Sequence, residues 1–538
     1  MSNRRKRVND ATAPCNNEQD GWRKRPPESC QIKAEIHRKV DEILATLEEN
    51  TRDRLFDAIE KTVRVLLFTL GRLFFAYFLT WRHEHAGEDV ERMKKSGKFR
   101  ERLPQPRLIG TCFGKVRYWR TYLRGRGGSG MYPLDAALGL PADGFSLFVM
   151  NLAAKFSTKL PYDQVAALLL DFFTWAPSKM TIEKAVLGFG KFTEEWFEKA
   201  PPPKRDGDVL IIQFDSKAAP TATESELEKR RGKRAQHPKA ASPRHRGRAS
   251  RKRRGPKRRK KKGDKSKNGK AATLVVMYTL KKVIDKDGKP LLLGPINKKV
   301  YGSFASKRHA FIVARREANK RRFQVDSGKM IQIVSDGDRD LENYSHEFFP
   351  GAVFTLDVMH VMEKIWEAGG CLHREGSPEL TAWVKKMERL IYRGKAIKVV
   401  GEIAGALEHI PSRGRGNKTR RKRLEDIRDY LFNRIDRMNY DWLRAQDLEL
   451  ASGSVEGAVK HVVGKRLDDG GMRWIEERAE ALLQLRCIEV NGDWDAFMAF
   501  VQGKVRKAAR EDHRIIRILT RKPAPILDLA LTARKQCT

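Results

Sequence analysis

Two stretches decide the fold: VLIIQFD at residues 209–215 and MIQIVSD at residues 330–336. Each is a short run of mainly apolar residues, which predicts a β-strand. Each run closes on an aspartate, Asp215 in the first and Asp336 in the second. Because a strand end is a rigid place for a side chain, we expect the fold to hold both carboxylates at fixed positions.

A third acid, Glu456, lies on a helix predicted to begin with SGSVEGAVKHVVGKR at residues 452–466. Small residues flank Glu456, which allows a metal ion or DNA to approach closely. Carboxylates are the hard oxygen ligands that Mg²⁺ prefers, and two such ions about 3.5–4 Å apart can promote cleavage or joining of a phosphodiester. We therefore expect Asp215, Asp336 and Glu456 to be both metal ligands and catalytic residues.

Other residues compete for these roles. Asp338 and Asp340 follow Asp336 in the sequence SDGDRD and are rivals for the second ligand. Gly337 permits the turn that would expose an acid there. Asp357 and His360, in DVMH, follow another predicted strand. They are either a structural pair or the orienting partners that metal ligands usually need.

The charge of the chain points to a polyanionic partner. The 538 residues carry a net charge of +41, and Lys229 to Lys270 contains 22 Lys or Arg and one acid. That tract has almost no apolar residues and cannot fold alone. It is either a solvated loop or a segment that contacts the phosphate backbone of DNA, and we favour DNA contact. The rest of the chain is also basic.

Other features of the sequence argue against several classes of protein. The six cysteines form no CxxC pair, which argues against a zinc ribbon or a disulfide framework and fits a reduced, cytoplasmic compartment. The N-terminus is polar and lacks the apolar core of a signal peptide. Val65 to Leu79 is very apolar but short for a membrane span and contains Arg72. We expect a buried or oligomer-forming helix there, and no membrane partner.

The N-terminal half is predicted to be mainly helical, with one cationic strand or hairpin at Gly114 to Leu123. Helices are expected at Tyr162 to Phe172 and at Ser178 to Gly188. The two helices form either a DNA-binding helix-turn-helix or an ordinary helical hairpin, and both alternatives stay open. From Val209 onward, strands alternate with helices as in a ribonuclease H-like layer.

These patterns predict five segments. A disordered basic tail at 1–29 precedes a mainly helical N-terminal DNA-binding region at 30–205. The first part of an α/β ribonuclease H-like catalytic core follows at 206–376, with a disordered basic tract at 221–270, and then come an all-helical insertion at 377–450 and the glutamate helix with C-terminal helices at 451–538.

Three blocks of sequence resemble the bacterial ISKra insertion-sequence transposases, within the DDE superfamily. The first is FDSKAAPTATESELEKRRGKR at 214–234, in which Ser216 stands where the family usually has glycine. The second runs from SDG at 335–337 to FFPGAVFTLDVMH at 348–360. The third, and the most specific, is SGSVEGAVKHVVGKRLDDGGMRW at 452–474. The segment YPLDAALGLP at 132–141 also resembles the family.

The resemblance implies a ribonuclease H-like core with Asp215, Asp336 and Glu456 as the catalytic triad. It implies Mg²⁺, with Mn²⁺ as a substitute, and double-stranded DNA as partner at both transposon ends and target. We also expect a homo-oligomer, a dimer or larger on DNA, and a bacterial, nucleoid-associated location. The residues expected to contact DNA are Lys217, Arg230, Arg231, Lys233, Arg234, Lys460, Lys465, Arg466, Arg473 and Trp474.

Some alternatives remain. A ribonuclease H-like nuclease that hydrolyses without strand transfer would keep the same acids, and a non-catalytic DNA-binding protein derived from a transposase would keep the basic charge. Trp474 stacks on an unpaired base in one interpretation and belongs to the core in the other, since large aromatic residues are usually buried.

Deleting residues 229–270 should weaken binding to random DNA and flatten its dependence on salt. Each lost phosphate contact lowers the slope of log K against log[salt] by about 0.9 on duplex DNA. Preference for the element's ends should survive, because phosphate contacts carry little sequence information. Fluorescence anisotropy across a salt series measures both quantities, and an unchanged slope would show that the tract does not touch the backbone.

Overall fold

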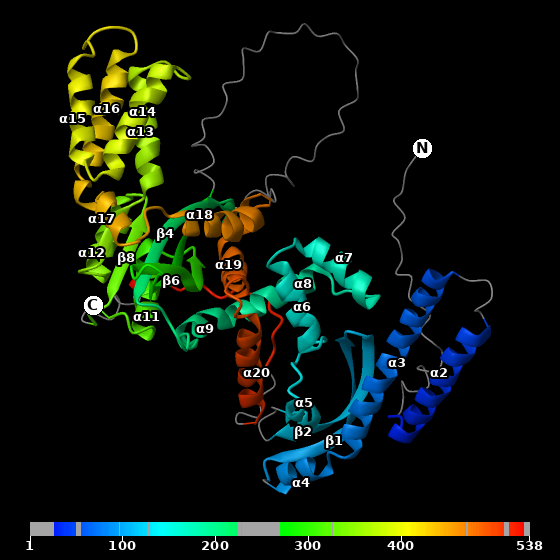
Figure 1. Ribbon diagram of the computed structural model, residues 1–538. Helices are drawn as coiled ribbons and strands as arrows, with labels where there is room; N and C mark the ends of the chain where they lie inside the picture. Colours follow the sequence, from blue (N-terminus) through cyan, green and yellow to red (C-terminus); the bar gives the residue numbers. More distant parts are fainter. Residues whose placement is uncertain are drawn as a thin grey trace. The chain divides into compact units, whose positions relative to one another are not determined.

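The computed structural model describes residues 26–49, 55–95, 97–125, 130–222, 228, 269–324, 327–469, 472–510 and 516–531. The predicted N-terminal tail up to residue 25 and almost all of the basic tract, with Arg230, Arg231, Lys233 and Arg234, lie outside these ranges. The described chain is mixed α/β and forms two compact units (Figure 1). One comprises Met1–Phe189 with Ala496–Arg521, and the other Gly190–Asp495 with Lys522–Thr538.

These units differ from the predicted boundaries in two respects. The first boundary falls at Phe189 rather than at residue 205. The segment 496–521 packs with the N-terminal unit, although it was expected to belong with the glutamate helix. The Asp143 carboxylate, for example, accepts a hydrogen bond of 2.6 Å from the backbone N–H of Ile518. A contact between residues this far apart in sequence has no local signal.

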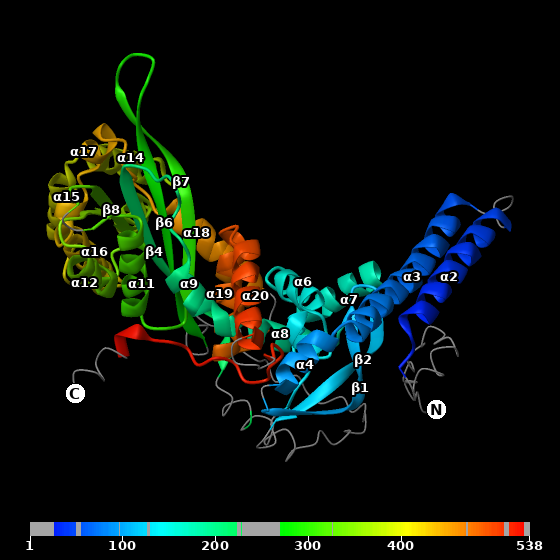
Figure 2. The ribbon, with the colours of Figure 1, turned by 90° about the horizontal axis from the view of Figure 1, so that it is seen from below.

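The second unit contains a five-stranded mixed sheet of order β7-β6-β4-β8-β9. Its strands pair antiparallel from β7 to β6 and from β6 to β4, and parallel from β4 to β8 and from β8 to β9. Beyond the other strands, β6 and β7 continue as a two-stranded ribbon (Figure 2). The strands are β4 (Val209–Ala219), β6 (Lys270–Ile284), β7 (Pro290–Ser303), β8 (Met330–Ser335) and β9 (Val353–Leu356).

Alternation along β4 and β8 divides the sheet into two faces. Leu210, Ile212 and Phe214 of β4 belong to one hydrophobic cluster with Ile331 and Ile333 of β8. The helices α11 (Lys307–Lys320) and α12 (Arg339–Phe348) cover that face and contribute to the cluster. The opposite face is covered by the region around α18 (Gly453–Ala458). Both faces are therefore buried, which explains why the two strands read as nearly continuous apolar runs.

Helices follow the last strand. The stretch 377–450 is largely helical, as predicted, and its helices form a bundle at one end of the sheet together with α13 (Figure 1). The helices here are α13 (Val358–Leu372), α14 (Pro378–Tyr392), α15 (Ala396–Glu408), α16 (Asn417–Phe432) and α17 (Tyr440–Ala445).

The chain after the insertion returns to the sheet. Following α18, residues Val459–Asp468 form a π-helix, η4, and α19 (Glu476–Val490) then packs against β7. The short strand β10 (Trp474–Ile475) pairs in parallel with β5 (Thr221–Ala222). The unit also includes α9 (Thr193–Lys199), whose side chains contact α19. Wide π-helical turns are rare and are frequently found at functional sites.

The N-terminal unit is built on a helical pair and a curved hairpin. The helices α2 (Ser29–Glu49) and α3 (Phe56–Glu84) pack against each other, and α3 also packs against β2 (Gly114–Gly125), which pairs antiparallel with β1 (Phe99–Thr111). The predicted strand at 114–123 is therefore present. The remaining elements are α4 (Gly87–Lys95), β3 (Gly130–Met131), α5 (Pro133–Ala137), α6 (Leu147–Ser157), α7 (Tyr162–Phe173), α8 (Lys179–Phe189) and the C-terminal α20 (Trp494–Arg510).

The apolar helix α3 has one buried face and one exposed face. Leu70, Leu73 and Leu79 pack in the core of the N-terminal unit, whereas Phe74 and Phe78 are 49% and 44% exposed. Among the described helices, α3 is the one long and apolar enough to cross a membrane by length and composition. The packed face fits the buried alternative expected for Val65 to Leu79, and the oligomer-forming alternative stays a prediction.

Glu480 on α19 should make the free energy of unfolding depend on pH. Its carboxylate accepts hydrogen bonds from Ser303 Oγ, the Phe304 N–H and Gln484 Nε2, yet burial raises the pKa of Glu480 to about 7. The protonated form is therefore favoured in the folded state. Its stabilising effect is present below the unfolded pKa, near 4.5, and is lost as pH rises through about 7.

We expect the free energy of unfolding to fall between pH 5 and pH 7.5 by a few kcal/mol, on the order of 1.4 kcal/mol per pKa unit. The Glu480→Gln variant, which cannot ionise, should lose most of this pH dependence. Chemical denaturation at a series of pH values measures the effect. An equal slope in the two proteins would show that Glu480 titrates normally.

Candidate metal centre

The strand register places Asp215 and Asp336 side by side. In the parallel pair of β4 and β8, Gln213 lies opposite Val334. Continuing this register by two residues brings Asp215 level with Asp336, and neighbouring strands are about 4.8 Å apart. Both side chains lie on the face opposite α11, because they alternate with residues of the cluster beneath that helix. The two predicted ligands therefore belong to one edge of the sheet.

Asp357 extends the same row. In the pair of β8 and β9, Ser335 lies opposite Leu356, so the next residues, Asp336 and Asp357, are level. The Asp357 N–H donates to the Ser335 carbonyl over 2.9 Å. Asp357 also caps α13, where its carboxylate accepts from the Met359 N–H. Three aspartates are thus level across three adjacent parallel strands, with Asp215 inside β4 and Asp336 and Asp357 directly after β8 and β9.

Three buried polar side chains bind the segment 449–455 to the sheet. Gln332 Oε1 accepts from the Glu449 N–H at 3.0 Å, and Gln332 Nε2 donates to the Glu449 carbonyl at 2.7 Å. Asp357 Oδ2 accepts from both the N–H and the Oγ of Ser452. Gln213 Oε1 accepts from the Val455 N–H at 3.0 Å. A buried polar group without a partner costs about 1–3 kcal/mol, so these bonds fix the segment firmly.

This attachment brings Glu456 to the row of aspartates. Glu456 follows Val455 on α18, and its side chain is exposed. Ligand atoms of Asp357, His360 and Glu456 lie within 4.8 Å of one another. His360 Nδ1 is 3.2 Å from Asp357 Oδ2. Asp357 and His360, expected as supporting residues, therefore lie close enough to Glu456 to share a metal with it.

The pKa of Asp215 is raised by burial and by the neighbouring acids. Burial is the main cause that raises this pKa to about 6, and the negative charges of Asp336 and Glu456 raise it further. His360 acts in the opposite sense on Asp215. The pKa of His360 itself is raised to about 9, chiefly by its hydrogen bond with Asp357 and then by the charges of Asp357 and Asp336. All five side chains therefore form one electrostatic cluster.

The turn after β8 distinguishes Asp336 from its rivals. Asp338 caps α12 and pairs with Lys307 Nζ at 2.7 Å, and Asp340 lies 3.2 Å from the same ammonium. Gly337 has φ +80°, as the predicted turn requires, and a Cβ there would lie 2.6 Å from the Tyr430 hydroxyl. That hydroxyl donates to the Asp336 carbonyl at 2.8 Å. Asp338 and Asp340 already have a cationic partner, which favours Asp336 as the ligand.

The residues predicted to contact DNA differ in how far their side chains are exposed to solvent. Lys460 and Lys465 are exposed, and Lys217 is partly exposed, with its ammonium 3.7 Å from Asp468. Arg466 and Trp474, by contrast, are buried at 3% and 7% exposure, and the guanidinium lies 5.0 Å from the ring centroid. Trp474 Nε1 donates to the Leu467 carbonyl at 3.1 Å.

Burial corrects the DNA-contacting roles expected for Arg466 and Trp474, and a hydrogen bond to the backbone engages Arg473. Trp474 is a core residue in this structure, as the alternative interpretation held, and neither its ring nor Arg466 is presented to a ligand. Arg473 Nε donates to the Thr221 carbonyl at 3.1 Å, which joins the segment 472–475 to β5. Trp474 and Arg473 stabilise the connection between η4 and α19, because the Trp474 ring fills its interior and each side chain donates a hydrogen bond to a backbone carbonyl.

Sequence reasoning did not identify Gln213, Gln332, Tyr430 or Ser452 as parts of the site. A signal was present for the glutamines, since each is a lone polar residue inside an apolar strand run. Such a residue, when buried, requires a partner. No comparable local signal marks Tyr430, which reaches the Asp336 turn from the helical insertion.

Comparison with models of known protein families gives no match for this chain, and comparison with curated proteins gives none either.

Replacing Asp357 by Asn should lower the pKa of His360 from about 9 toward its ordinary value near 6.5, because the main cause of the shift is removed. Glu363→Gln provides a matched control, since Glu363 contributes least among the groups that raise this pKa. Histidine titration by NMR measures both variants. Equal shifts in the two would mean that Asp357 is not the dominant partner.

Proposed function

We propose that this chain is a DDE transposase that cleaves DNA at the ends of its own element and joins the 3′ ends to target DNA. The observation that carries the proposal is that Asp215 and Asp336 are level on adjacent strands while Glu456 is held near them, within 4.8 Å of Asp357 and His360. The three blocks of sequence that resemble the ISKra transposases supply these same three acids. We further propose that the sheet, with three antiparallel strands followed by two parallel ones, is a ribonuclease H-like core.

The donor set fits Mg²⁺ at this edge. Asp215, Asp336 and Glu456 offer carboxylate oxygens, and their mutual influence on the pKa of Asp215 is the repulsion that a bound cation relieves. Asp357 would orient His360, and either could complete the ligand set. When bound, divalent metal would activate the attacking oxygen and stabilise the leaving oxygen of a phosphodiester.

The chain's own residues would supply position and charge around the DNA. Segment 449–455 holds Glu456 against the sheet, and Tyr430 fixes the backbone at Asp336. Lys460 and Lys465 are exposed on the helical segment after Glu456 and would contact phosphates. We propose that the N-terminal unit recognises the element's ends. We also propose a homo-oligomer, for which the exposed apolar face of α3 is a candidate contact.

The variants Asp215→Asn, Asp336→Asn and Glu456→Gln should each abolish cleavage and leave DNA binding intact or slightly stronger. They remove metal ligands, and loss of negative charge does not weaken binding to a polyanion. The substrate is DNA carrying the inverted repeats that flank the gene, with Mg²⁺ present. Gel analysis of nicked, cut and joined products distinguishes strand transfer from simple hydrolysis.

Asp340→Asn is the matched control for the triad variants. Asp340 is an exposed acid near Asp336 that pairs with Lys307, so its loss should leave the cleavage rate near that of the wild type. A triad variant that cleaves at the wild-type rate was wrongly assigned. Products that are cut but never joined would favour the hydrolytic nuclease.

A further inference from the structure

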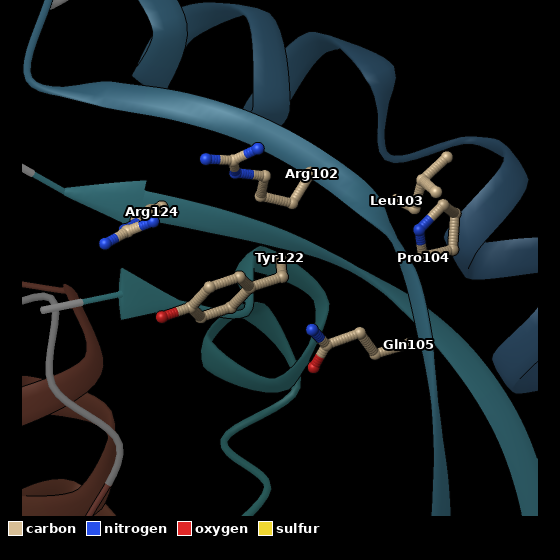
Figure 3. A pocket seen from close by; sticks show the side chains of 6 residues that line it. All are labelled: Arg102, Leu103, Pro104, Gln105, Tyr122 and Arg124. Atoms are coloured by element: carbon tan, nitrogen blue, oxygen red, sulfur yellow. The ribbon is translucent and has the colours of Figure 1, made fainter. Parts of the chain in front are cut away.

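The β1–β2 hairpin contains an open hollow of about 600 Å³ at the end away from its turn. Arg102, Leu103, Pro104 and Gln105 of β1 line it, together with Tyr122 and Arg124 of β2 (Figure 3). The Tyr122 ring extends from β2 on the side away from Arg102, and the Arg124 side chain comes from the same strand (Figure 3). The lining therefore combines one aromatic ring, one amide and two cations.

A β-bulge creates this arrangement. Arg102 pairs with Tyr122, but the next pair is Gln105 with Arg120, so Leu103 and Pro104 oppose a single residue of β2. Arg102 and Gln105 are three residues apart and would point to opposite faces of a regular strand. The extra residue returns Gln105 to the face of Arg102 and Tyr122. Bulges commonly re-aim side chains in this way beside functional sites.

The two arginines of the hollow are available to a ligand. Both are exposed, and within the described ranges no hydrogen bond or ion pair engages either guanidinium. Arg120, on the same face, is different, because it contacts Asp135 and its guanidinium lies 3.4 Å from the Tyr132 ring centroid. The hairpin as a whole, residues 99–125, has seven Lys or Arg and one acid. An anionic ligand would therefore be attracted to the hollow.

The aromatic and amide groups are held in place. The Tyr122 and Tyr132 rings are 5.0 Å apart, and the Tyr132 hydroxyl donates to Gln105 Oε1 at 2.7 Å. This bond leaves the Gln105 amide hydrogens free to donate to an acceptor on a base edge. Gly130 allows the Tyr122 ring to lie across β3, since a Cβ at that position would overlap the ring.

We propose that this hollow binds one unpaired nucleotide of single-stranded DNA. The base stacks on the Tyr122 ring, Gln105 donates to its edge, and Arg102 and Arg124 contact the adjacent phosphates. Paired bases in a duplex are already stacked and cannot enter such a hollow. The inference deepens the DNA-binding part of the proposed function and does not depend on the metal centre.

The test measures binding of a short fluorescein-labelled oligothymidylate to the full chain by anisotropy, without divalent metal and across a salt series. Tyr122→Leu should weaken binding by between about fivefold and about 150-fold, whereas Tyr122→Phe, which keeps a stacking ring, should bind like the wild type. Arg102→Gln and Arg124→Gln should each reduce the slope of log K against log[salt] by about 0.7.

Arg117→Gln is the matched control for charge. Arg117 is exposed on the same strand as Arg124, but strand alternation places it on the opposite face. We expect this variant to bind the oligonucleotide nearly as the wild type does. If Arg117→Gln weakens binding as much as Arg124→Gln, the hairpin binds by diffuse charge and the hollow is not a site. Equal binding by Tyr122→Leu and Tyr122→Phe, at unchanged melting temperatures, would also overturn the proposal.

Failure of this inference is separable from failure of the proposed function. Hollow variants that bind normally, in a chain whose wild type cuts and joins the element's ends, would reject the nucleotide site alone. A wild type that binds the oligonucleotide through Tyr122 but never cleaves DNA would reject the transposase and retain the site.

Discussion

Gln213, Gln332 and Asp357 impose the constraint on which the candidate centre depends. Each side chain is buried on the same face of the sheet, where an unpaired polar group would cost about 1–3 kcal/mol. Their partners are backbone and hydroxyl groups of residues 449–455. The segment therefore has to lie on this face, and Glu456 is carried to the strand ends although Gln213 and Val455 are 242 residues apart in sequence.

The same face explains the electrostatics of the centre. Acids that meet at a partly buried strand edge repel one another, and the pKa of Asp215 rises to about 6 as a result of burial first and of that repulsion second. His360 offsets part of the charge, because Asp357 holds its imidazole and favours the protonated form. The proposed metal would relieve both the repulsion and the competition with a proton at this cluster.

The elements of the second unit follow closely from local patterns. The apolar runs at 209–214 and 330–334 are strands, and the first continues beyond the predicted run to Ala219. Long periodic segments are the most predictable because burial on a face imposes its own spacing. The boundaries between units were less predictable. Residues 496–521 belong to the N-terminal unit through contacts such as Asp143 with Ile518, which local sequence does not encode.

The sequence by itself determined which residues could form strands and helices, the basic character of the chain, and the three acids worth placing in one site. It left Trp474 open between a ligand contact and the core, and it did not assign a role to Gln213 or Gln332. Tertiary structure decided these points, because burial and hydrogen-bond partners depend on segments distant in the chain. The strand register, which sets Asp215, Asp336 and Asp357 level, is likewise a property of paired strands and of no single one.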